Sequence, residues 1–390
     1  MALGKSGVML TVSRRLLSGV GLLALTVRSY GREPDDRAPS EAPVNPDVQA
    51  VHPVDEHDMW NLPAGTLGGR QFWGDRLHFR GWRIQTNVLT GHSRLLDPED
   101  RRQAWGTVEQ CRKTLEGVKK SRGLKPMSGK GVVLIHGIIR SSHSFSAMRE
   151  ALVADGYEVV GFDYPSTQVS IEESSEYLHQ TLESLDGIEE IDLVVHSMGG
   201  LVVRQYLSAH RDPRIRRMVM LGVPNHGANL ANLLKNVRLF KTIYGPAGAQ
   251  LCEGPDAYVS RLPTPDFPFG IIAGGKGTAA GFNPWIAGDD DGTVAVESTR
   301  LAGAADFLRV PALHTFMMRD PAVIAATKRF LASGVLAESG VANPIAKKPE
   351  EANNVGMGSL ESANADDRPD QGPPRSPGFE PDGPSRPRCF

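Results

Sequence analysis

Residues 191–200 read IDLVVHSMGG, and this stretch decides the fold. Its first part is a short apolar run rich in β-branched residues, which is typical of a buried strand. Behind it, apolar residues continue at helical spacing at Leu201, Val202, Val203, Tyr206 and Leu207. We therefore predict a strand, a tight turn and a helix. Ser197 at the turn is held on a strained backbone with its hydroxyl exposed, so it is our candidate nucleophile.

The serine motif resembles the nucleophile elbow of the α/β-hydrolase superfamily, G-x-S-x-G, in the G-H-S-M-G-G form common among lipases and esterases. Val195 stands where the first glycine of that motif usually lies. Because that glycine relieves crowding between strand and helix, we expect a slightly wider turn here. A serine at the end of a strand is ordinarily just a helix cap, so the neighbouring motifs decide its role.

Composition restricts the partners of the chain. Of 390 residues, 40% are hydrophobic and the formal net charge is −2, with both signs interspersed. This pattern gives no electrostatic footprint for nucleic acid, so we expect a small or apolar partner. Cys111, Cys252 and Cys389 show no C-x-x-C spacing, so they indicate neither a zinc site nor a disulfide framework. A bridge between Cys111 and Cys252 would need an oxidising compartment, and we do not expect it.

The N-terminus resembles an export signal. Lys5, Arg14 and Arg15 precede an uncharged run over 16–27, which fits a signal-peptide core and is shorter than the roughly 20 residues that span a bilayer. We predict that 1–31 is a signal peptide or, since no clean A-x-A site follows, a membrane anchor. The protein would then be periplasmic, secreted or held at a membrane. A buried N-terminal helix is the alternative.

We predict one α/β-hydrolase-like domain over 67–335, in which strands alternate with helices from residue 132 onward. We predict two antiparallel strands near 77–88, a helix from a cap at Asp97 to Gly123, and later helices that begin with a capping box at Ser170 and a cap at Asp320. The expected buried strands are 132–135, 159–162, 191–196, 218–221, 270–273 and 307–310. This order indicates an α/β fold with a mostly parallel sheet, helices on both faces and catalytic groups at the carboxyl ends of the strands.

Three other segments stand apart from this alternation. Residues 32–66 are rich in Pro, Asp and Glu, and we predict a disordered linker. Residues 225–266 carry helical apolar residues but begin after a strand has ended, so we interpret them as a small helical cap insertion over the site. Residues 336–390 turn polar and then proline-rich, which predicts a disordered tail.

A serine nucleophile needs a base and an acid that orients it, and the superfamily places them in the order serine, acid, histidine. Residues 288–294 read GDDDGTV and resemble the D-G-x-V loop that carries the acid in many lipases. Asp291 precedes the glycine and is our choice. Asp290 is the alternative, since three adjacent carboxylates repel and only one need face inward. Two adjacent acids do not form a calcium ligand set, so we predict no metal.

His314 follows the last predicted strand, where the superfamily places its base. His136 and His226 compete with it. His136 lies in an H-G motif whose family role is to shape the oxyanion loop, and His226 lies in a P-N-H-G segment that resembles the T-P-x-H-G segment of lipases. His196 adjoins Ser197, and we expect it to pack into the elbow.

The resemblance implies an oxyanion hole made from the backbone N–H groups of Ile138 and Met198. With Ile139 and Phe145, these apolar residues would line the mouth of the site, although at least one of Ile138 and Ile139 would enter the core. An apolar mouth favours an acyl or alkyl group over a sugar or phosphate.

The sequence therefore predicts an α/β-hydrolase fold and a lipase-like or esterase-like serine hydrolase of carboxylic esters, acting on a small-molecule or lipid ester without a cofactor. An acyltransferase or thioesterase with the same triad is the first alternative. A binding protein with a degenerate elbow, suggested by Val195, is the second.

Overall fold

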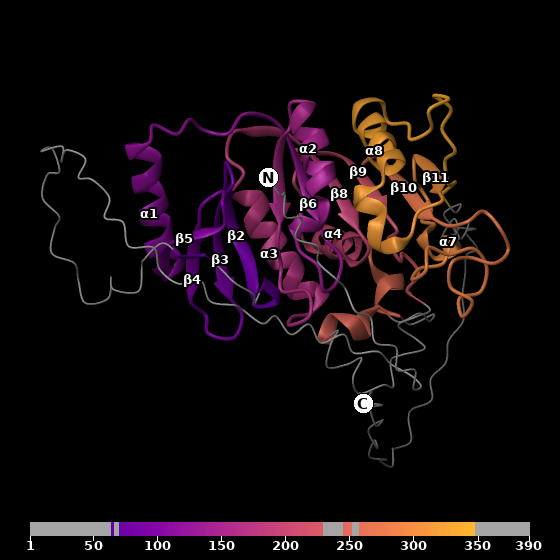
Figure 1. Ribbon diagram of the computed structural model, residues 1–390, viewed down its shortest axis with the longest axis horizontal. Coiled ribbons are helices and arrows are strands. Elements are labelled where there is room, and N and C mark those ends of the chain that lie inside the picture. The colour runs from indigo at the N-terminus through magenta and orange to yellow at the C-terminus, as the bar shows by residue number, and fades with distance from the viewer. Residues whose placement is uncertain (1–63, 66–69, 229–244, 252–256, 348–390) are drawn as a thin grey trace, which may run out of the picture. The chain divides into compact units, whose positions relative to one another are not determined.

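We analysed a computed structural model of the chain, which describes residues 64–65, 70–228, 245–251 and 257–347 (Figure 1). All of them belong to one compact unit, 56–390. The predicted signal peptide or anchor, nearly all of the linker, part of the cap insertion, and the tail beyond 347 lie outside the described residues. In the described ranges we find no helix with the length and hydrophobicity needed to cross a bilayer.

A parallel sheet forms the centre of the described region. Its strands are β6 (Gly129–Ile135), β7 (Glu158–Phe162), β8 (Ile188–His196), β9 (Ile215–Leu221), β10 (Phe269–Gly274) and β11 (Asp306–Val310). Their spatial order is β11-β10-β9-β8-β6-β7, and every neighbouring pair is parallel. Each of the six predicted buried strands lies within one of these elements. The predicted fold class is therefore confirmed.

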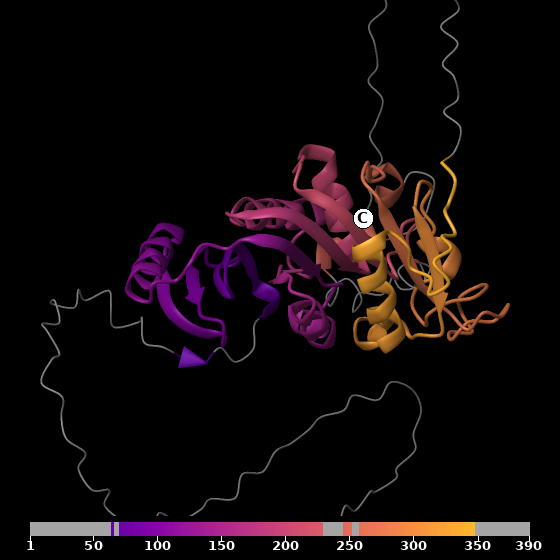
Figure 2. The same cartoon turned by 90° about the horizontal axis from the view of Figure 1, so that it is seen from above.

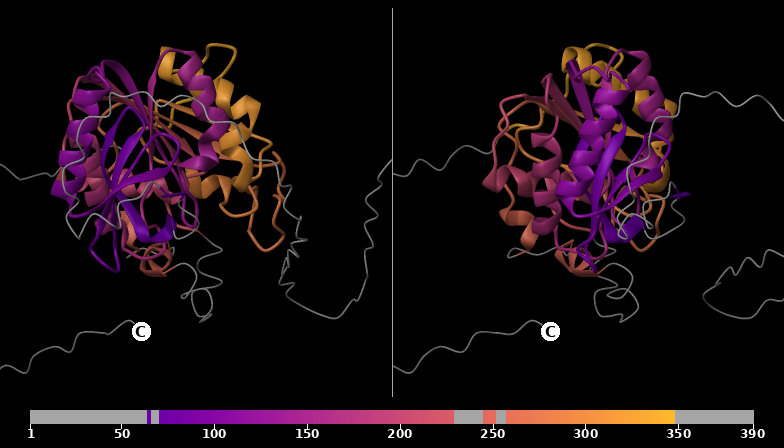
Figure 3. Two further views of the ribbon diagram at one scale, coloured as in Figure 1. Left: turned by 60° about the vertical axis from the view of Figure 1, so that its left-hand side comes forward. Right: turned by 90° about the vertical axis from the view of Figure 1, so that its left-hand side faces the viewer.

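Helices cover both faces of this sheet, as predicted (Figure 3). Successive side chains of β6 alternate: Val133 and Ile135 join the core under α3 (Ile171–Glu183) and α4 (Met198–Ala209). Val132 and Leu134 join the core under α2 (Ser146–Ala154) and α8 (Pro321–Ser333). Both faces must be apolar because each is covered by a helix layer, which explains the continuous hydrophobic runs in the sequence.

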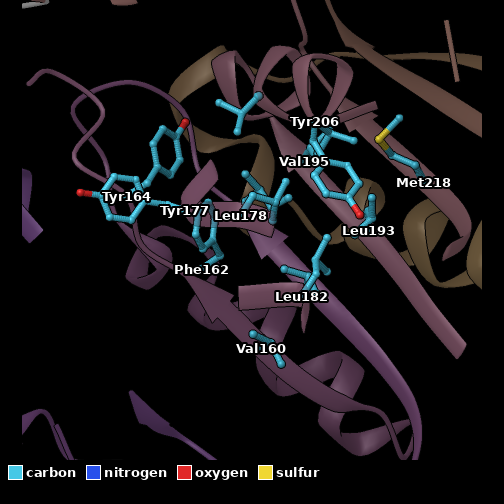
Figure 4. Packing of buried hydrophobic residues seen from close by; sticks show 14 of the residues in the cluster. Val160, Phe162, Tyr164, Tyr177, Leu178, Leu182, Leu193, Val195, Tyr206 and Met218 are labelled. Atoms are coloured by element: carbon cyan, nitrogen blue, oxygen red, sulfur yellow. The ribbon is translucent and has the colours of Figure 1, made fainter. Parts of the chain in front are cut away.

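Local signals fix the ends of two of these helices. Ser170 caps α3 in a complete capping box with Glu173, and the Asp320 carboxylate accepts the N–H groups of Ala322 and Val323 at the start of α8. Figure 4 shows the core that results on the α3 and α4 side, where Leu178, Leu182 and Tyr206 pack toward β8.

The N-terminal strands form an antiparallel sheet larger than the predicted hairpin. It contains β1 (Ala64–Gly65), β2 (Trp73–Phe79), β3 (Trp82–Asn87), β4 (Ser93–Leu96) and β5 (Arg101–Gly106), in the order β1-β5-β4-β3-β2. Figure 2 shows this N-terminal region in indigo and violet. Thus residues 64–65, near the end of the segment assigned to the linker, belong to a strand. The Asp75 N–H donates to the Asp163 carbonyl just after β7, which joins the two sheets.

The helix predicted from Asp97 to Gly123 is wrong in its first half. Residues 101–106 form β5, and α1 (Val108–Ser121) begins at a capping box on Thr107. The Asp97 carboxylate does accept backbone N–H groups, from Glu99 and Arg101, but it does so in the turn that joins β4 to β5. The same aspartate chemistry suits a helix cap and a tight turn, so the sequence did not separate them.

The predicted disordered tail begins too early. Leu336 is buried, and its N–H donates to the Asp306 carboxylate, which also accepts the N–H of Asn343. Ile345 then exchanges backbone hydrogen bonds with Gly303 and Ala304. The prediction failed because Asp306, in the last strand, supplies acceptors for a segment that has little hydrophobic pattern of its own.

Candidate active site

Ser197 lies between the end of β8 and the start of α4, where the sequence predicted the elbow. Its backbone has φ 53° and ψ −128°, a conformation that is strained for any residue other than glycine. The Ser197 N–H donates to the Leu221 carbonyl at the end of the neighbouring strand β9, which holds the turn. The predicted strained presentation of the hydroxyl is therefore observed.

The two glycines after the serine allow the helix to start close to the sheet. A Cβ on Gly199 would lie 2.6 Å from the Ile135 carbonyl oxygen and 2.7 Å from that of His136. A Cβ on Gly200 would meet Val223. Val195 does not obstruct the elbow, because its side chain is buried in the core on the α4 side (Figure 4).

The structure brings Ser197, His314 and Asp291 into one chain of hydrogen bonds. The Ser197 Oγ lies 3.0 Å from His314 Nε2, and His314 Nδ1 lies 2.7 Å from Asp291 Oδ2. All three side chains are buried, with relative exposures of 8%, 7% and 1%. With Nδ1 donating to the carboxylate, Nε2 carries the lone pair that accepts the serine proton. This is the arrangement that serine nucleophiles require.

Asp291 is held firmly at its end of this chain. Its Oδ1 accepts the backbone N–H groups of Thr293 and Val294, at 3.0 and 2.7 Å, which leaves Oδ2 for the imidazole. The His314 N–H donates to the Asp291 carbonyl at 2.9 Å. The acid and the base are therefore linked through both side chain and backbone.

The three adjacent aspartates face three different partners. Asp289 accepts the N–H groups of Lys276 and Gly277. Asp290 accepts those of Asn283 and Gly292 and does not contact His314. Hydrogen bonds to separate loops let three carboxylates lie side by side despite their mutual repulsion. Asp291, rather than the alternative Asp290, therefore occupies the position of the acid.

Topology and elbow together decide the fold. In the sheet, β7 lies at the edge next to β6. The serine turn follows β8, which is the third parallel strand along the chain. The acid and base lie in loops beyond the later strands β10 and β11. The protein has the α/β-hydrolase fold. The predicted resemblance to this superfamily is thus confirmed at the level of the fold.

The other histidines do not join the chain of hydrogen bonds from Ser197 to Asp291. His136 Nδ1 lies 2.7 Å from the Gly137 carbonyl, and its ring stacks on Tyr164. His226 is exposed and forms no contact with the triad. His196 lies in the elbow, as expected, but does more than pack: its Nε2 lies 3.0 Å from the His314 carbonyl. Burial and the neighbouring His314 hold the pKa of His196 well below its usual range, so it is neutral.

Two backbone N–H groups near Ser197 are free. In the described region, the N–H groups of Ile138 and Met198 have no protein acceptor, whereas that of Ile139 donates to Ser166 Oγ at 3.0 Å. Met198 is the first residue of α4, where a helix leaves its N–H groups unpaired. Ser166 and the left-handed φ of Ile139, 64°, fix the loop. Ser166 could not be predicted from the sequence because nothing in its spacing indicates a contact across 27 residues.

A cavity of about 340 Å³ opens onto the serine. Its lining comprises Gly137, Ile138, Ile139, Arg140, His196, Ser197, Pro224, Ala228, Leu251, Thr293, Val294, His314 and Thr315. The expectation that Phe145 and Met198 line this mouth is wrong, because both side chains are buried in the cores on opposite faces of the sheet. Ile138 is partly buried against the core, and Ile139 is 43% exposed.

The side chains that commonly bind metals, and the described cysteine, are arranged as follows. We find no group of three or more His, Cys, Asp or Glu side chains there that could hold a metal ion. Cys111 is a free, buried thiol, and burial raises its pKa to about 11, so it is protonated and inert.

Comparisons with known proteins found similarities over part of the chain. A family model described as a domain of unknown function, DUF7379, matches residues 98–262. The chain is also similar to the mature lipase BlEst2 of Bacillus licheniformis, with 19% identity, a TM-score of 0.42 and coverage of 54% of this chain and 94% of that one.

Two further solved structures are similar over part of the chain. Phospholipase PlaB of Legionella pneumophila has 16% identity and a TM-score of 0.36, and the match covers 44% of this chain and 45% of PlaB. A pyrethroid hydrolase of Sphingobium faniae has 13% identity and a TM-score of 0.34, over 53% of this chain and 98% of that one.

Proposed function

We propose that the protein is a serine hydrolase that cleaves carboxylic esters with apolar acyl or alkyl groups through an acyl-enzyme intermediate. The observation that carries the proposal is the continuous hydrogen-bonded chain from Ser197 through His314 to Asp291 on a strained elbow that faces a cavity. A serine that only capped a helix would need neither a buried imidazole nor a carboxylate behind it.

The first half of the reaction acylates the serine. His314 Nε2 takes the Ser197 proton as Oγ attacks the ester carbonyl carbon, and Asp291 stabilises the imidazolium that forms. The oxyanion of the tetrahedral intermediate accepts hydrogen bonds from the free N–H groups of Ile138 and Met198. His314 then gives its proton to the alkoxy oxygen as the carbon–oxygen bond breaks, and the alcohol leaves.

The second half reverses these roles with water. His314 removes a proton from a water molecule, whose oxygen attacks the acyl carbon. The tetrahedral intermediate collapses, the bond to Ser197 Oγ breaks, and His314 returns the proton to the serine. The carboxylic acid leaves, and no oxidant, reductant or metal takes part.

The shape and lining of the cavity support an apolar substrate group. Ile138, Pro224, Ala228, Leu251 and Val294 contribute hydrophobic surface next to the serine. Such a surface gains free energy by excluding water from an acyl or alkyl chain.

A matched pair of serine variants tests the proposal. We expect wild-type protein to hydrolyse p-nitrophenyl butyrate and Ser197→Ala to lose this activity by at least about a thousandfold, since the nucleophile is removed. Ser208→Ala, on the exposed side of α4, is the control and should keep full activity. Ser197→Ala protein that folds and still turns over the ester would reject the proposal.

A further inference from the structure

Two arginines lie beside the cavity that contains the serine. Arg140 lines that cavity together with Ser197. Arg140 and Arg319 also line a second cavity of about 350 Å³, and the two cavities share Ile139 and Arg140. Arg319 ends the short 3-10 helix η5 (His314–Arg319), which begins at the proposed base. The fold therefore places one guanidinium group at the cavity of Ser197 and a second in the adjoining cavity.

Neither guanidinium group has a protein partner among the described residues. Neither an ion pair nor a hydrogen bond engages the guanidinium group of Arg140 or Arg319 there. The neighbouring acids serve other groups: Asp100 pairs with Arg83 and His143, and Asp320 caps α8.

Some other arginines near the sheets have carboxylate partners. Arg83 pairs with Asp163, and Arg216 pairs with Asp192. The guanidinium groups of Arg140 and Arg319 have no such partner in the described region, so their charges are available to a ligand.

The side chain of Arg140 is also not needed for the local structure. Its backbone holds the loop, because its N–H donates to the Gly137 carbonyl and its carbonyl accepts a hydrogen bond from Gln71 Nε2. Partial burial and the positive charge of Arg319 lower the pKa of Arg140. Two like charges held close together without a counter-charge repel each other, and a bound anion would relieve that repulsion.

We propose that Arg140 and Arg319 bind an oxyanion group, a phosphate or a carboxylate, that is carried by the ester substrate. The inference rests on the proposed function and narrows it: the substrate is an anionic amphiphile. Its apolar chain occupies the cavity at Ser197, and its charged group lies on the arginines. A guanidinium presents paired N–H donors that match the oxygens of a phosphate or a carboxylate.

Binding to a variant that cannot turn over substrate tests the site directly. In the Ser197→Ala background, we expect octyl phosphate or octanoate to bind at least about tenfold more tightly than octanol, by calorimetry at low salt. Adding Arg140→Gln or Arg319→Gln should weaken the binding of octyl phosphate or octanoate by about tenfold. Arg112→Gln removes an equal charge from the exposed face of α1 and should leave the affinity unchanged.

Three results would overturn the inference. Equal affinity for octyl phosphate and octanol would show that the arginines do not bind the anion. An equal loss on Arg112→Gln would indicate a general charge effect. Octyl phosphate that binds no more tightly than inorganic phosphate would indicate a site for a free anion rather than for a substrate.

Kinetics separate this inference from the proposed function. The ratio of kcat/KM for 1-octanoylglycerol 3-phosphate to that for 1-octanoylglycerol should exceed one in the wild type and fall about tenfold in Arg140→Gln. A wild type that hydrolyses both esters equally contradicts the inference alone. A wild type that hydrolyses neither ester, while the Ser197→Ala variant binds octyl phosphate as expected, contradicts the proposed function alone.

Discussion

His196 Nε2 donates a hydrogen bond to the backbone carbonyl of His314 at 3.0 Å, so the residue before the proposed nucleophile holds the main chain of the proposed base. The two imidazole rings lie 4.6 Å apart, and His196 is buried and neutral. His196 is therefore a positioning residue. It holds the main chain of His314 in place without touching the substrate's reacting atoms.

Replacement of His196 should impair the reaction more than the fold. In His196→Phe the His314 carbonyl loses its donor, a change worth about 1–3 kcal/mol, and we expect kcat to fall roughly tenfold or more with little change in KM. His196→Gln offers an amide N–H and should recover part of the loss. Steady-state kinetics beside thermal melting checks this; a fall in melting temperature with unchanged kcat would assign His196 to the core only.

The neighbouring aspartates should separate into a catalytic and a structural residue. Asp291→Asn removes the carboxylate behind His314, so we expect kcat to fall on the order of 10⁴-fold, as for other buried triad aspartates. Asp290→Ala leaves two backbone N–H groups without an acceptor and should lower the free energy of unfolding by about 1–3 kcal/mol while keeping most of kcat. An inactive Asp290→Ala variant and an active Asp291→Asn variant would contradict the assignment of Asp291 as the acid.

Two glycines give opposite predictions for the same substitution. Gly199→Ala would push a methyl group against the carbonyl oxygens of Ile135 and His136, so we expect a loss of about 1–3 kcal/mol in unfolding free energy, and lost activity. Gly117 in α1 has open space around it, and Gly117→Ala should raise stability by about 0.5–1 kcal/mol. Urea unfolding of both variants measures the difference; equal effects would contradict the close approach at the elbow.

Stability should fall below pH 6.5 because of a buried histidine. Burial lowers the pKa of His78 to about 3, so the folded state excludes a proton that the unfolded state binds below pH 6.5. The unfolding free energy therefore rises with pH between about 3 and 6.5, by about 1.4 kcal/mol per pH unit from this group. Burial lowers the pKa values of His136 and His196 too, and they act in the same direction.

Urea unfolding at pH 7.5 and pH 5 checks the sign. In His78→Phe, which cannot titrate, the difference in unfolding free energy between these pH values should shrink by about 2 kcal/mol. An unchanged difference would mean that His78 takes up a proton in the folded protein.

The sequence allowed prediction of the parts of the fold that have a strong local signal. The parallel strands are continuous apolar runs because helices cover both faces, and the caps at Ser170 and Asp320 use side chains next to the bonds they make. The site residues Asp291 and His314 were found through family order and not through spacing, since His314 meets Ser197 across 117 residues.

What escaped prediction depends on contacts distant in sequence. Asp97 could cap a helix or close a turn, and only the pairing of β5 with β4 decides for the turn. Leu336 and Asn343 are ordered by the Asp306 carboxylate, which lies at least 30 residues earlier. The pairing of Arg140 with Arg319 around one cavity has no sequence signal at all, because it depends on loops after different strands.

The most direct test of the account is covalent labelling of the native protein with a fluorophosphonate probe, followed by peptide mapping. Because His314 and Asp291 activate the Ser197 hydroxyl, we predict one modified residue, Ser197, with labelling abolished in Ser197→Ala and strongly slowed in His314→Ala. Ser208→Ala should label as the wild type does. Folded wild-type protein whose Ser197 stays unmodified, or labelling that persists in Ser197→Ala, would contradict the account.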